Sequence, residues 1–129
     1  MIVVTAMRSI AHKQLFIQVL TSVENMYRAF RGNWYEKKLK KLSTKEQEIV
    51  QQFEQDVKQN PYQGSPLGYT FFREKRINGK RMYYLIYDSH KVVFLITISD
   101  KKAQQDVIDV VKANLDVYKE QIEKILKNI

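Results

Sequence analysis

The apolar residues near the N-terminus recur at steps of three and four. That spacing places them on one face of a helix. The residues that follow it are Leu15, Val19, Leu20, Val23, Met26, Tyr27 and Phe30. A short β-branched run at residues 2–4 comes before them and is typical of a strand. We therefore expect a strand followed by a helix that extends to Phe30.

Two further helices are indicated before residue 60. The first is a lysine-rich stretch at residues 34–42. Ser43 and Glu46 then have the spacing of a capping box, in which each side chain binds a free backbone amide at the start of a helix. A stripe of apolar residues follows. Asn60 and Pro61 are expected to end this helix, because a residue before proline is disfavoured in α geometry.

After the loop at residues 60–67, the pattern becomes strand-like. Asn78 and Gly79 tolerate the positive φ angles of a type I′ turn, so residues 69–77 and 80–88 are predicted to pair as a hairpin. Residues 91–99 contain a continuous apolar run, which indicates a strand buried on both faces. The three strands should form an antiparallel meander.

One long helix is predicted at the end of the chain, with Asp100 as its cap. Its apolar stripe comprises Val107, Ile108, Val111, Leu115, Tyr118, Ile122, Ile125 and Leu126. The predicted class is α+β, with helices packed on a small antiparallel sheet. A chain of 129 residues, 44% of them hydrophobic, is expected to form one domain over residues 1–129.

The excess of positive charge indicates which class of partner the chain could bind. Lysine and arginine number 22 against 14 acidic residues, which gives a net charge of +8 and favours a polyanion such as nucleic acid. Solubility alone would also explain this charge. The absence of cysteine excludes disulfides, thiolate nucleophiles and cysteine-ligated zinc, and fits the cytoplasm. We expect no metal, no cofactor and no contact with a membrane.

Candidate chemistry lies on the predicted hairpin. A two-residue turn pairs Arg76 with Arg81 and Glu74 with Tyr83, so these four side chains share one face. Glu74 is either an acid or base or, as we favour, an ion-pair partner of the arginines. Tyr83 is either an acid or stacking group or a packed strand residue. The opposite face should pack on the helices and carries Phe71, Met82, Tyr84 and Ile86.

The order of these elements resembles the RelE/ParE superfamily of toxin–antitoxin toxins, and three motifs support the resemblance. They are the lysine-rich residues 36–42, the Asn-Pro-Tyr loop at residues 60–67, and residues 79–87, where an arginine precedes aromatic and branched residues. Residues 1–25 are then an N-terminal extension, with the first strand near residues 26–30, or part of an elongated first strand and helix. The helical spacing favours the second arrangement.

The resemblance implies a RelE-like endonuclease that cuts messenger RNA on the ribosome, inhibits translation and is held in check by a cognate antitoxin. Arg81 matches the arginine of the family's third strand. The implied catalytic set is Arg81, Arg76, Glu74 and Tyr83. The implied RNA-binding set is Arg73, Lys75, Lys80, Lys101, Lys102, Lys37 and Lys41.

One position departs from the pattern of RelE proper. Where the last helix of RelE carries a tyrosine, this chain has Val107. This difference favours a second function class, a ParE-like or other superfamily member that binds RNA or protein without cleaving RNA. A basic structural protein with no toxin activity is the third class.

Overall fold

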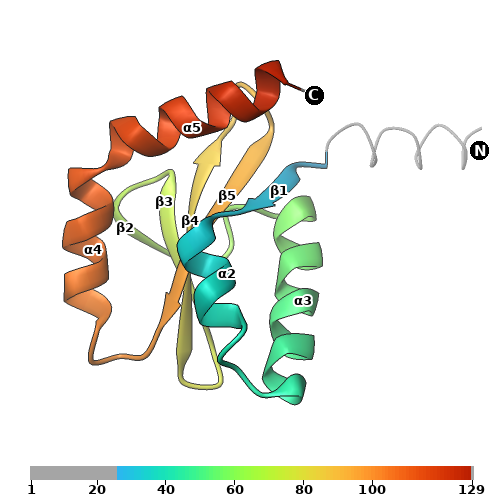
Figure 1. Ribbon diagram of the computed structural model, residues 1–129, viewed down its shortest axis with the longest axis vertical. Helices are drawn as coiled ribbons and strands as arrows, with labels where there is room; N and C mark the ends of the chain where they lie inside the picture. The colour runs from blue at the N-terminus through green and yellow to red at the C-terminus, as the bar shows by residue number, and fades with distance from the viewer. Residues whose placement is uncertain (1–25, 129) are drawn as a thin grey trace, which may run out of the picture.

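Four helices and five strands form from residues 26–128, the part of the chain that this computed structural model describes (Figure 1). In chain order they are β1 (Arg28–Arg31), α2 (Asn33–Leu39), α3 (Thr44–Gln59), β2 (Ser65–Tyr69), β3 (Phe72–Ile77), β4 (Lys80–Tyr87), β5 (Val92–Ser99), α4 (Gln104–Ala113) and α5 (Leu115–Lys127). The predicted α+β class is confirmed. Whether residues 1–129 form one domain stays a prediction.

The strands form one sheet in the order β1-β5-β4-β3-β2. The predicted meander of β3, β4 and β5 is confirmed, and all its pairs are antiparallel. At the hairpin turn, Asn78 and Gly79 have φ angles of 51° and 76°, in the left-handed region where these two residue types are tolerated. The predicted register is also confirmed, since Arg76 pairs with Arg81 and Glu74 with Tyr83.

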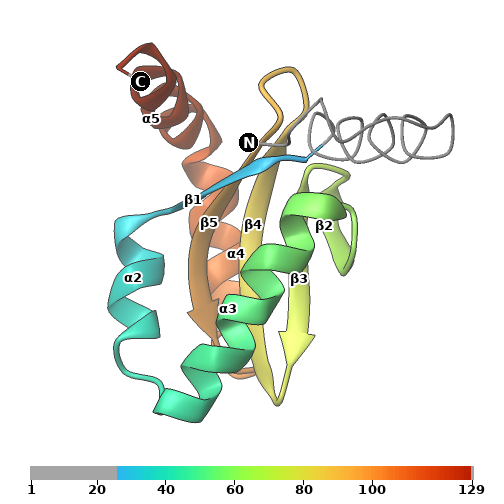
Figure 2. The ribbon, with the colours of Figure 1, turned by 90° about the vertical axis from the view of Figure 1, so that its right-hand side faces the viewer.

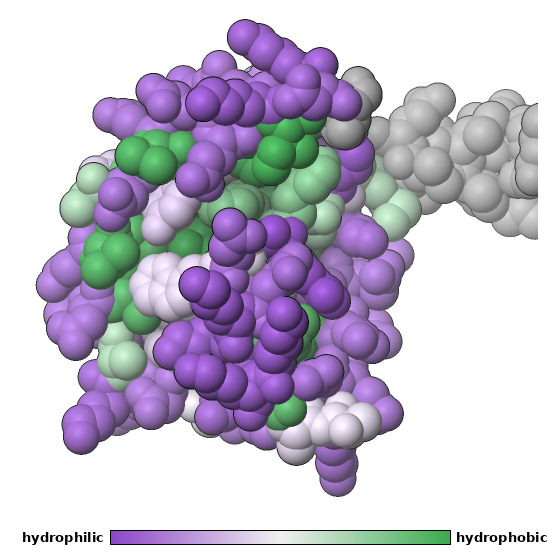
Figure 3. Space-filling model, in the orientation of Figure 1, coloured by the Kyte–Doolittle hydropathy of each residue, from purple (hydrophilic) through white to green (hydrophobic). Residues whose placement is uncertain are grey.

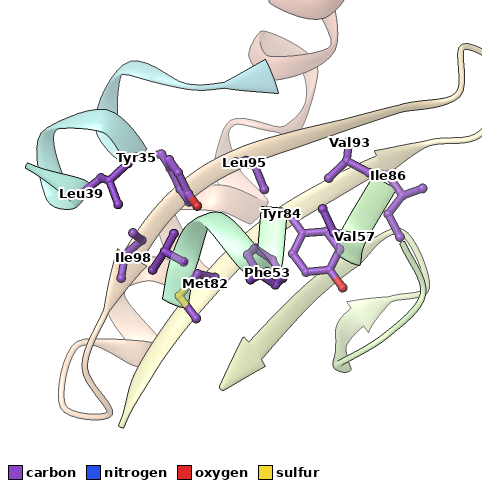
Figure 4. Close-up of a cluster of buried hydrophobic side chains, with 11 residues drawn as sticks. Tyr35, Leu39, Phe53, Val57, Met82, Tyr84, Ile86, Val93, Leu95 and Ile98 are labelled. Carbon is purple, nitrogen blue, oxygen red and sulfur yellow. The ribbon is translucent and has the colours of Figure 1, made fainter. Parts of the chain in front are cut away.

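Helices cover both faces of the sheet, and Figure 2 shows α3 and α4 on opposite sides of it. Along β4, alternate residues point to opposite faces. Met82, Tyr84 and Ile86 pack with residues of α2 and α3, as Figure 4 shows, whereas Tyr83 and Leu85 pack with residues of α4 and α5. The central strands β4 and β5 are therefore buried on both sides, as their apolar runs predicted.

The predicted capping box at the start of α3 is confirmed. The Ser43 hydroxyl accepts a hydrogen bond from the Glu46 amide, and the Glu46 carboxylate accepts one from the Ser43 amide. These bonds lower the pKa of Glu46. At the other end, Asn60 follows the last helical residue, as expected before Pro61.

The prediction of a helix as far as Phe30 was wrong, because residues 28–31 form β1. This strand runs parallel to β5, with the Arg28 amide bonded to the Lys91 carbonyl at 2.9 Å and the Gly32 amide to the Leu95 carbonyl at 2.8 Å. The first strand of the sheet thus lies where the extension arrangement placed it. The strand predicted at residues 2–4 and the helix predicted through residue 25 lie outside the described residues.

The predicted strand at residues 69–77 is in fact parts of two strands. Tyr69 ends β2, residues 70 and 71 form a turn, and β3 begins at Phe72. The sequence does not predict β2, because it contains a proline and a glycine and both residue types are depleted in strands. Phe71, expected in the core, lies in the turn with 37% of its surface exposed.

The prediction of one long final helix was also wrong, in two respects. It divides into α4 and α5 at Asn114, whose φ of −122° and ψ of 18° are not helical. Its cap is not Asp100, because the helix starts at Gln104 and Ala103 precedes it. The Asp100 carboxylate instead accepts a hydrogen bond of 3.0 Å from the Ala103 amide, which holds the turn before the helix.

The surface seen in Figure 3 differs in polarity from place to place. Hydrophilic residues cover α2 in the middle of the view, and hydrophobic patches lie between α2 and the corner formed by α4 and α5. Phe30, Trp34 and Tyr118 are partly buried and pack against the core cluster that includes residues of α4 and α5. Within residues 26–128, no helix is both long and apolar enough to cross a membrane.

Candidate functional site

The four candidate side chains of the hairpin lie on the α4-facing side of the sheet, near the Asn78-Gly79 turn. The alternation along β3 and β4 puts them there, because the register pairs Arg76 with Arg81 and Glu74 with Tyr83. Ser99, at the end of β5, pairs with Arg81. Residues from three strands therefore meet where β5 leads into α4.

Glu74 is the centre of this group. Its carboxylate is almost fully buried and accepts two hydrogen bonds from the side-chain Nε2 of Gln104 on α4, at 2.9 and 3.0 Å. Arg81 and Arg76 each bring their Nε atom close to it, at 3.6 and 3.7 Å. We call Glu74, Arg76, Arg81 and Gln104 the Glu74 cluster. The predicted ion-pair role of Glu74 agrees with these contacts.

The two arginines of the cluster differ in exposure. The side chain of Arg76 is 67% exposed, whereas that of Arg81 is only 7% exposed. The Arg81 Nε–H is buried and makes no hydrogen bond, because its contact with Glu74 is too long. An unsatisfied donor on a buried guanidinium costs free energy, and an acceptor such as a phosphate oxygen would satisfy it.

Tyr83 faces the same side, but its hydroxyl does not join the cluster. It lies 2.8 Å from the Ser99 hydroxyl, and the residue is fully buried. Burial raises the pKa of Tyr83 above its ordinary value. A phenol with a raised pKa holds its proton more firmly, so Tyr83 in this position suits packing better than proton transfer.

The lysines predicted to bind RNA do not form one group. Lys101 and Lys102 are exposed in the turn between β5 and α4, at the same end of the sheet as Arg76. Lys75 and Lys80 are half-buried and belong to the α3 side of the sheet, where Lys75 pairs with Met82 and lines a groove beside Phe53. Exposed lysines of α2 and of the turn after it make up the rest, namely Lys37 and Lys41.

Arg73 lies in a position unsuited to its predicted contact with RNA. It is only 9% exposed, and its guanidinium donates hydrogen bonds to three backbone carbonyls. These are the carbonyls of Gln63 at 3.2 Å, Thr70 at 3.0 Å and Gly64 at 3.1 Å. Arg73 therefore ties both ends of β2 to β3, which is a structural role.

Sequence reasoning missed two residues of this site, Gln104 and Ser99. Nothing in the chain marks Gln104, because it is one of two neighbouring glutamines at a helix start. Only the strand register, extended from β4 to β5, could have placed Ser99 beside Arg81. Among residues 26–128, no group of three or more histidine or acidic side chains could hold a metal ion.

The arrangement therefore offers cations rather than a free acid or base. Arg76, Lys101 and Lys102 present positive charge to solvent at one end of the sheet, and Arg81 is buried at the same end. Such a set can bind phosphate groups and stabilise charge that develops on them. The carboxylate of Glu74 is already occupied by three partners.

Comparison with solved structures shows what fold this is. The chain resembles a RelBE toxin–antitoxin complex from Mycobacterium tuberculosis, with a TM-score of 0.54 and 22% identity over 59% of this chain and 92% of the other. For a mutant of the Escherichia coli toxin RelE in the free state, the TM-score is 0.59, with 21% identity over 68% and 97% of the two chains.

An intact Escherichia coli RelBE complex is also similar, with a TM-score of 0.53 and 20% identity over 57% of this chain and 95% of the other. No family model and no curated protein matches the sequence. The likeness is therefore one of structure, and it agrees with the motifs at residues 36–42, 60–67 and 79–87. The chain has the fold of the RelE toxins.

Proposed function

We propose that this protein is the toxin of a toxin–antitoxin pair and that it inhibits translation by acting on messenger RNA at the ribosome. Two observations support the proposal. The fold is that of toxins solved with their antitoxins. The single observation that carries it to RNA is the unbonded Nε–H of buried Arg81, at the same end of the sheet as the exposed cations Arg76, Lys101 and Lys102.

In this proposal the cations bind the RNA backbone. Arg76 and the two lysines contact phosphates from solvent, and Arg81 donates to the phosphate that reacts. The exposed lysines of α2 and the turn after it, Lys37 and Lys41, contact other phosphates, as do Lys75 and Lys80 from the α3 side. The net charge of +8 attracts the RNA over a longer range. The setting is the cytoplasm.

Cleavage would follow from attack by the ribose 2′-hydroxyl. Its oxygen forms a bond to the adjacent phosphorus, the bond from phosphorus to the 5′-oxygen breaks, and a cyclic phosphate remains. A base takes the proton of the 2′-hydroxyl and an acid gives a proton to the 5′-oxygen. Arg81 would stabilise the charge on the phosphate oxygens. Glu74 and Tyr83 are the candidate base and acid of the protein.

A second candidate function is binding without cleavage. The burial of Glu74 and Tyr83 favours it, since both groups already have partners inside the protein. Either side chain would have to leave its partner to reach an RNA proton. In this alternative the cationic end binds RNA, or a protein target, and blocks it without chemistry.

Expression in a host cell separates these functions. Growth and the 5′ ends of messenger RNA are compared for the wild type, Arg81→Ala, the pair Lys101→Ala and Lys102→Ala, and a control, Lys119→Ala, from the exposed surface of α5. The nuclease proposal requires new RNA ends that both site variants lose and the control keeps. Growth arrest without new ends would support binding without cleavage.

The antitoxin proposal has its own test. A neighbouring reading frame that encodes a small protein with an acidic, amphipathic C-terminal helix is the expected antitoxin. Coexpression of that protein should restore growth and yield a complex that purifies together. Growth unaffected by a folded, accumulating wild-type protein would contradict the toxin proposal altogether.

A further inference from the structure

The exposed aromatic side chains gather at one place in the fold. Within residues 26–128, five large hydrophobic side chains are exposed, and the three aromatic ones all belong to the segment from 62 to 71. They are Tyr62, Tyr69 and Phe71, with 37%, 43% and 37% of their surface exposed. We call these three residues the aromatic edge, because β2 is the last strand on its side of the sheet.

Tyr69 and Phe71 form a flat pair at this edge. Their ring centroids lie 4.9 Å apart with 29° between the ring planes, so the rings are stacked. The turn between β2 and β3 brings them together, and its position is fixed by a backbone hydrogen bond of 2.8 Å from Ile86 to the Phe71 carbonyl. The rings are therefore held without being needed for the core.

Two cations lie near the rings of the aromatic edge. The Lys112 ammonium is 5.9 Å from the centre of the Tyr69 ring. Gly68 permits this approach, because a Cβ atom there would come within 2.7 Å of the Lys112 nitrogen. Arg73 lies over the Tyr62 ring at 5.6 Å, but it is buried and bonded to backbone carbonyls. The exposed cation at the pair is therefore Lys112.

Two acidic side chains of the adjoining segments, Asp88 and Asp109, are already hydrogen-bonded. Asp88 accepts hydrogen bonds from the hydroxyls of Tyr27 and Tyr62, which places it at the far end of the Tyr62 ring. On α4, Asp109 accepts a hydrogen bond from Gln105, one turn before Lys112. The surface at Tyr69 and Phe71 therefore combines exposed flat rings with positive charge.

We propose that Tyr69 and Phe71 form a stacking platform for a base of single-stranded RNA, with Lys112 contacting a neighbouring phosphate. Bases stack on aromatic rings whatever their identity, and cations beside the rings bind the backbone. The proposal rests on the proposed function, in which messenger RNA binds at the opposite end of β3. The platform adds a second contact on the same strand of RNA.

Binding of a short, labelled oligoadenylate RNA to the whole protein tests the platform. We expect the pair of changes Tyr69→Ala and Phe71→Ala to weaken binding about tenfold, since one stacked base contributes roughly that factor. The control is the pair Val110→Ala and Val117→Ala, which truncates two exposed aliphatic side chains on α4 and α5. A folded double-alanine variant that binds as tightly as the wild type would overturn the proposal.

The nature of the contact can be tested separately. Salt dependence is measured as the slope of log affinity against log salt concentration. Loss of the rings should leave this slope unchanged, whereas Lys112→Ala should reduce its magnitude by about one, the value for one phosphate contact. An RNA with abasic sites should bind the wild type and the double-alanine variant equally. A tenfold difference that persists with abasic RNA would show that the rings do not stack on bases and would contradict the platform.

Two further arms keep the outcomes distinct. If the alanine pair fails to fold, Tyr69→Leu with Phe71→Leu keeps the apolar volume and removes the rings, and the same loss is expected. Weaker binding in the ring variant together with unchanged binding in the Lys101→Ala, Lys102→Ala pair would support the platform and contradict the proposed site. Weaker binding in the Lys101→Ala, Lys102→Ala pair together with unchanged binding in the ring variant would contradict the platform. So would a ring variant that binds RNA normally and loses only its copurification with the neighbouring gene product.

Discussion

Gln104, the first residue of α4, donates two hydrogen bonds to the buried carboxylate of Glu74 on β3. This contact joins the helix layer to the sheet at the end where the cations gather. Removal of the Gln104 side chain would leave the carboxylate with only the longer contacts to Arg76 and Arg81. The stability of the site therefore depends on a residue that contributes no charge.

The first prediction concerns this contact. Gln104→Ala should lower the free energy of unfolding by about 2 kcal/mol, because a buried carboxylate loses its hydrogen bonds. Gln105→Ala is the control, since Gln105 bonds only to exposed Asp109, and should change stability by less than about 0.5 kcal/mol. Urea unfolding measures both. Equal losses in the two variants would show that the Glu74 contact adds no stability.

The second prediction separates Arg73 from the RNA-binding cations. Arg73→Ala should lower the free energy of unfolding by about 3 kcal/mol, because three backbone carbonyls lose a charged donor. Arg73→Lys should recover part of this loss, since an ammonium cannot reach all three carbonyls in the planar geometry of a guanidinium. The control Arg76→Ala, on the same strand, should cost less than about 1 kcal/mol because its side chain is mostly exposed.

For RNA affinity, in contrast to stability, the change at Arg76 should have the larger effect and the change at Arg73 the smaller. At a temperature where all the variants are folded, Arg76→Ala should weaken RNA binding and Arg73→Lys should not. A strong loss of RNA affinity in a stable Arg73→Lys variant would contradict the structural role of Arg73.

The sequence predicted the central hairpin well, because its signals are local. Asn78 and Gly79 fix the turn, the turn fixes the register, and the register places Glu74, Arg76 and Arg81 on one face. The capping box of Ser43 is equally local. What the sequence could not show is burial, so Arg73 and Arg81 could not be distinguished from the exposed Arg76.

The errors arose where distant contacts decide the structure. The apolar spacing that predicted a helix through Phe30 is overridden at β1, where pairing with β5 holds the backbone extended. The stripe of the last helix continues across the break at Asn114, because Val111 of α4 and Ile122 of α5 pack in the same cluster. A periodic pattern reports which residues are buried and does not report a bend between two helices.

The third prediction is that the stability contributed by the hydrogen bonds of Asp88 to two tyrosines depends on pH. Its hydrogen bonds raise the pKa of Tyr27 and of Tyr62 from 10.0 to about 12. Because the folded state favours the neutral phenols, this stabilisation is complete below pH 10 and is lost as the pH rises towards 12. Asp88→Ala should therefore be less stable than the wild type below pH 10, and the difference should shrink above it.

Urea unfolding at a series of pH values tests this, with tyrosinate absorbance as a second readout. In Asp88→Ala, two tyrosines should ionise at lower pH than in the wild type. Glu120→Ala, from the exposed surface of α5, is the control and should leave the absorbance titration unchanged. A stability difference between Asp88→Ala and wild type that grows from pH 10 to 12 would contradict the stated sign.

The fourth prediction concerns the attachment of β1 to α3. Arg31 donates two hydrogen bonds to the Glu54 carboxylate, at 2.7 and 2.8 Å, and these bonds raise the pKa of Arg31. The Glu54 side chain is 9% exposed and that of Arg31 is 38% exposed, so the ion pair is only partly screened by solvent. A cycle of Arg31→Ala, Glu54→Ala and the double variant should give a coupling of about 1.5 kcal/mol.

The same cycle on Gln52 and Asp56, an exposed pair one turn apart on α3, is the control and should give less than about 0.5 kcal/mol. Hydrogen exchange adds a local readout. Arg31→Ala should speed exchange of the β1 amides more than exchange in β4, because β1 is a short strand at the side of the sheet. If coupling is no larger than in the control and β1 exchange is unchanged, pairing with β5 alone holds β1, and the ion pair contributes nothing to its position.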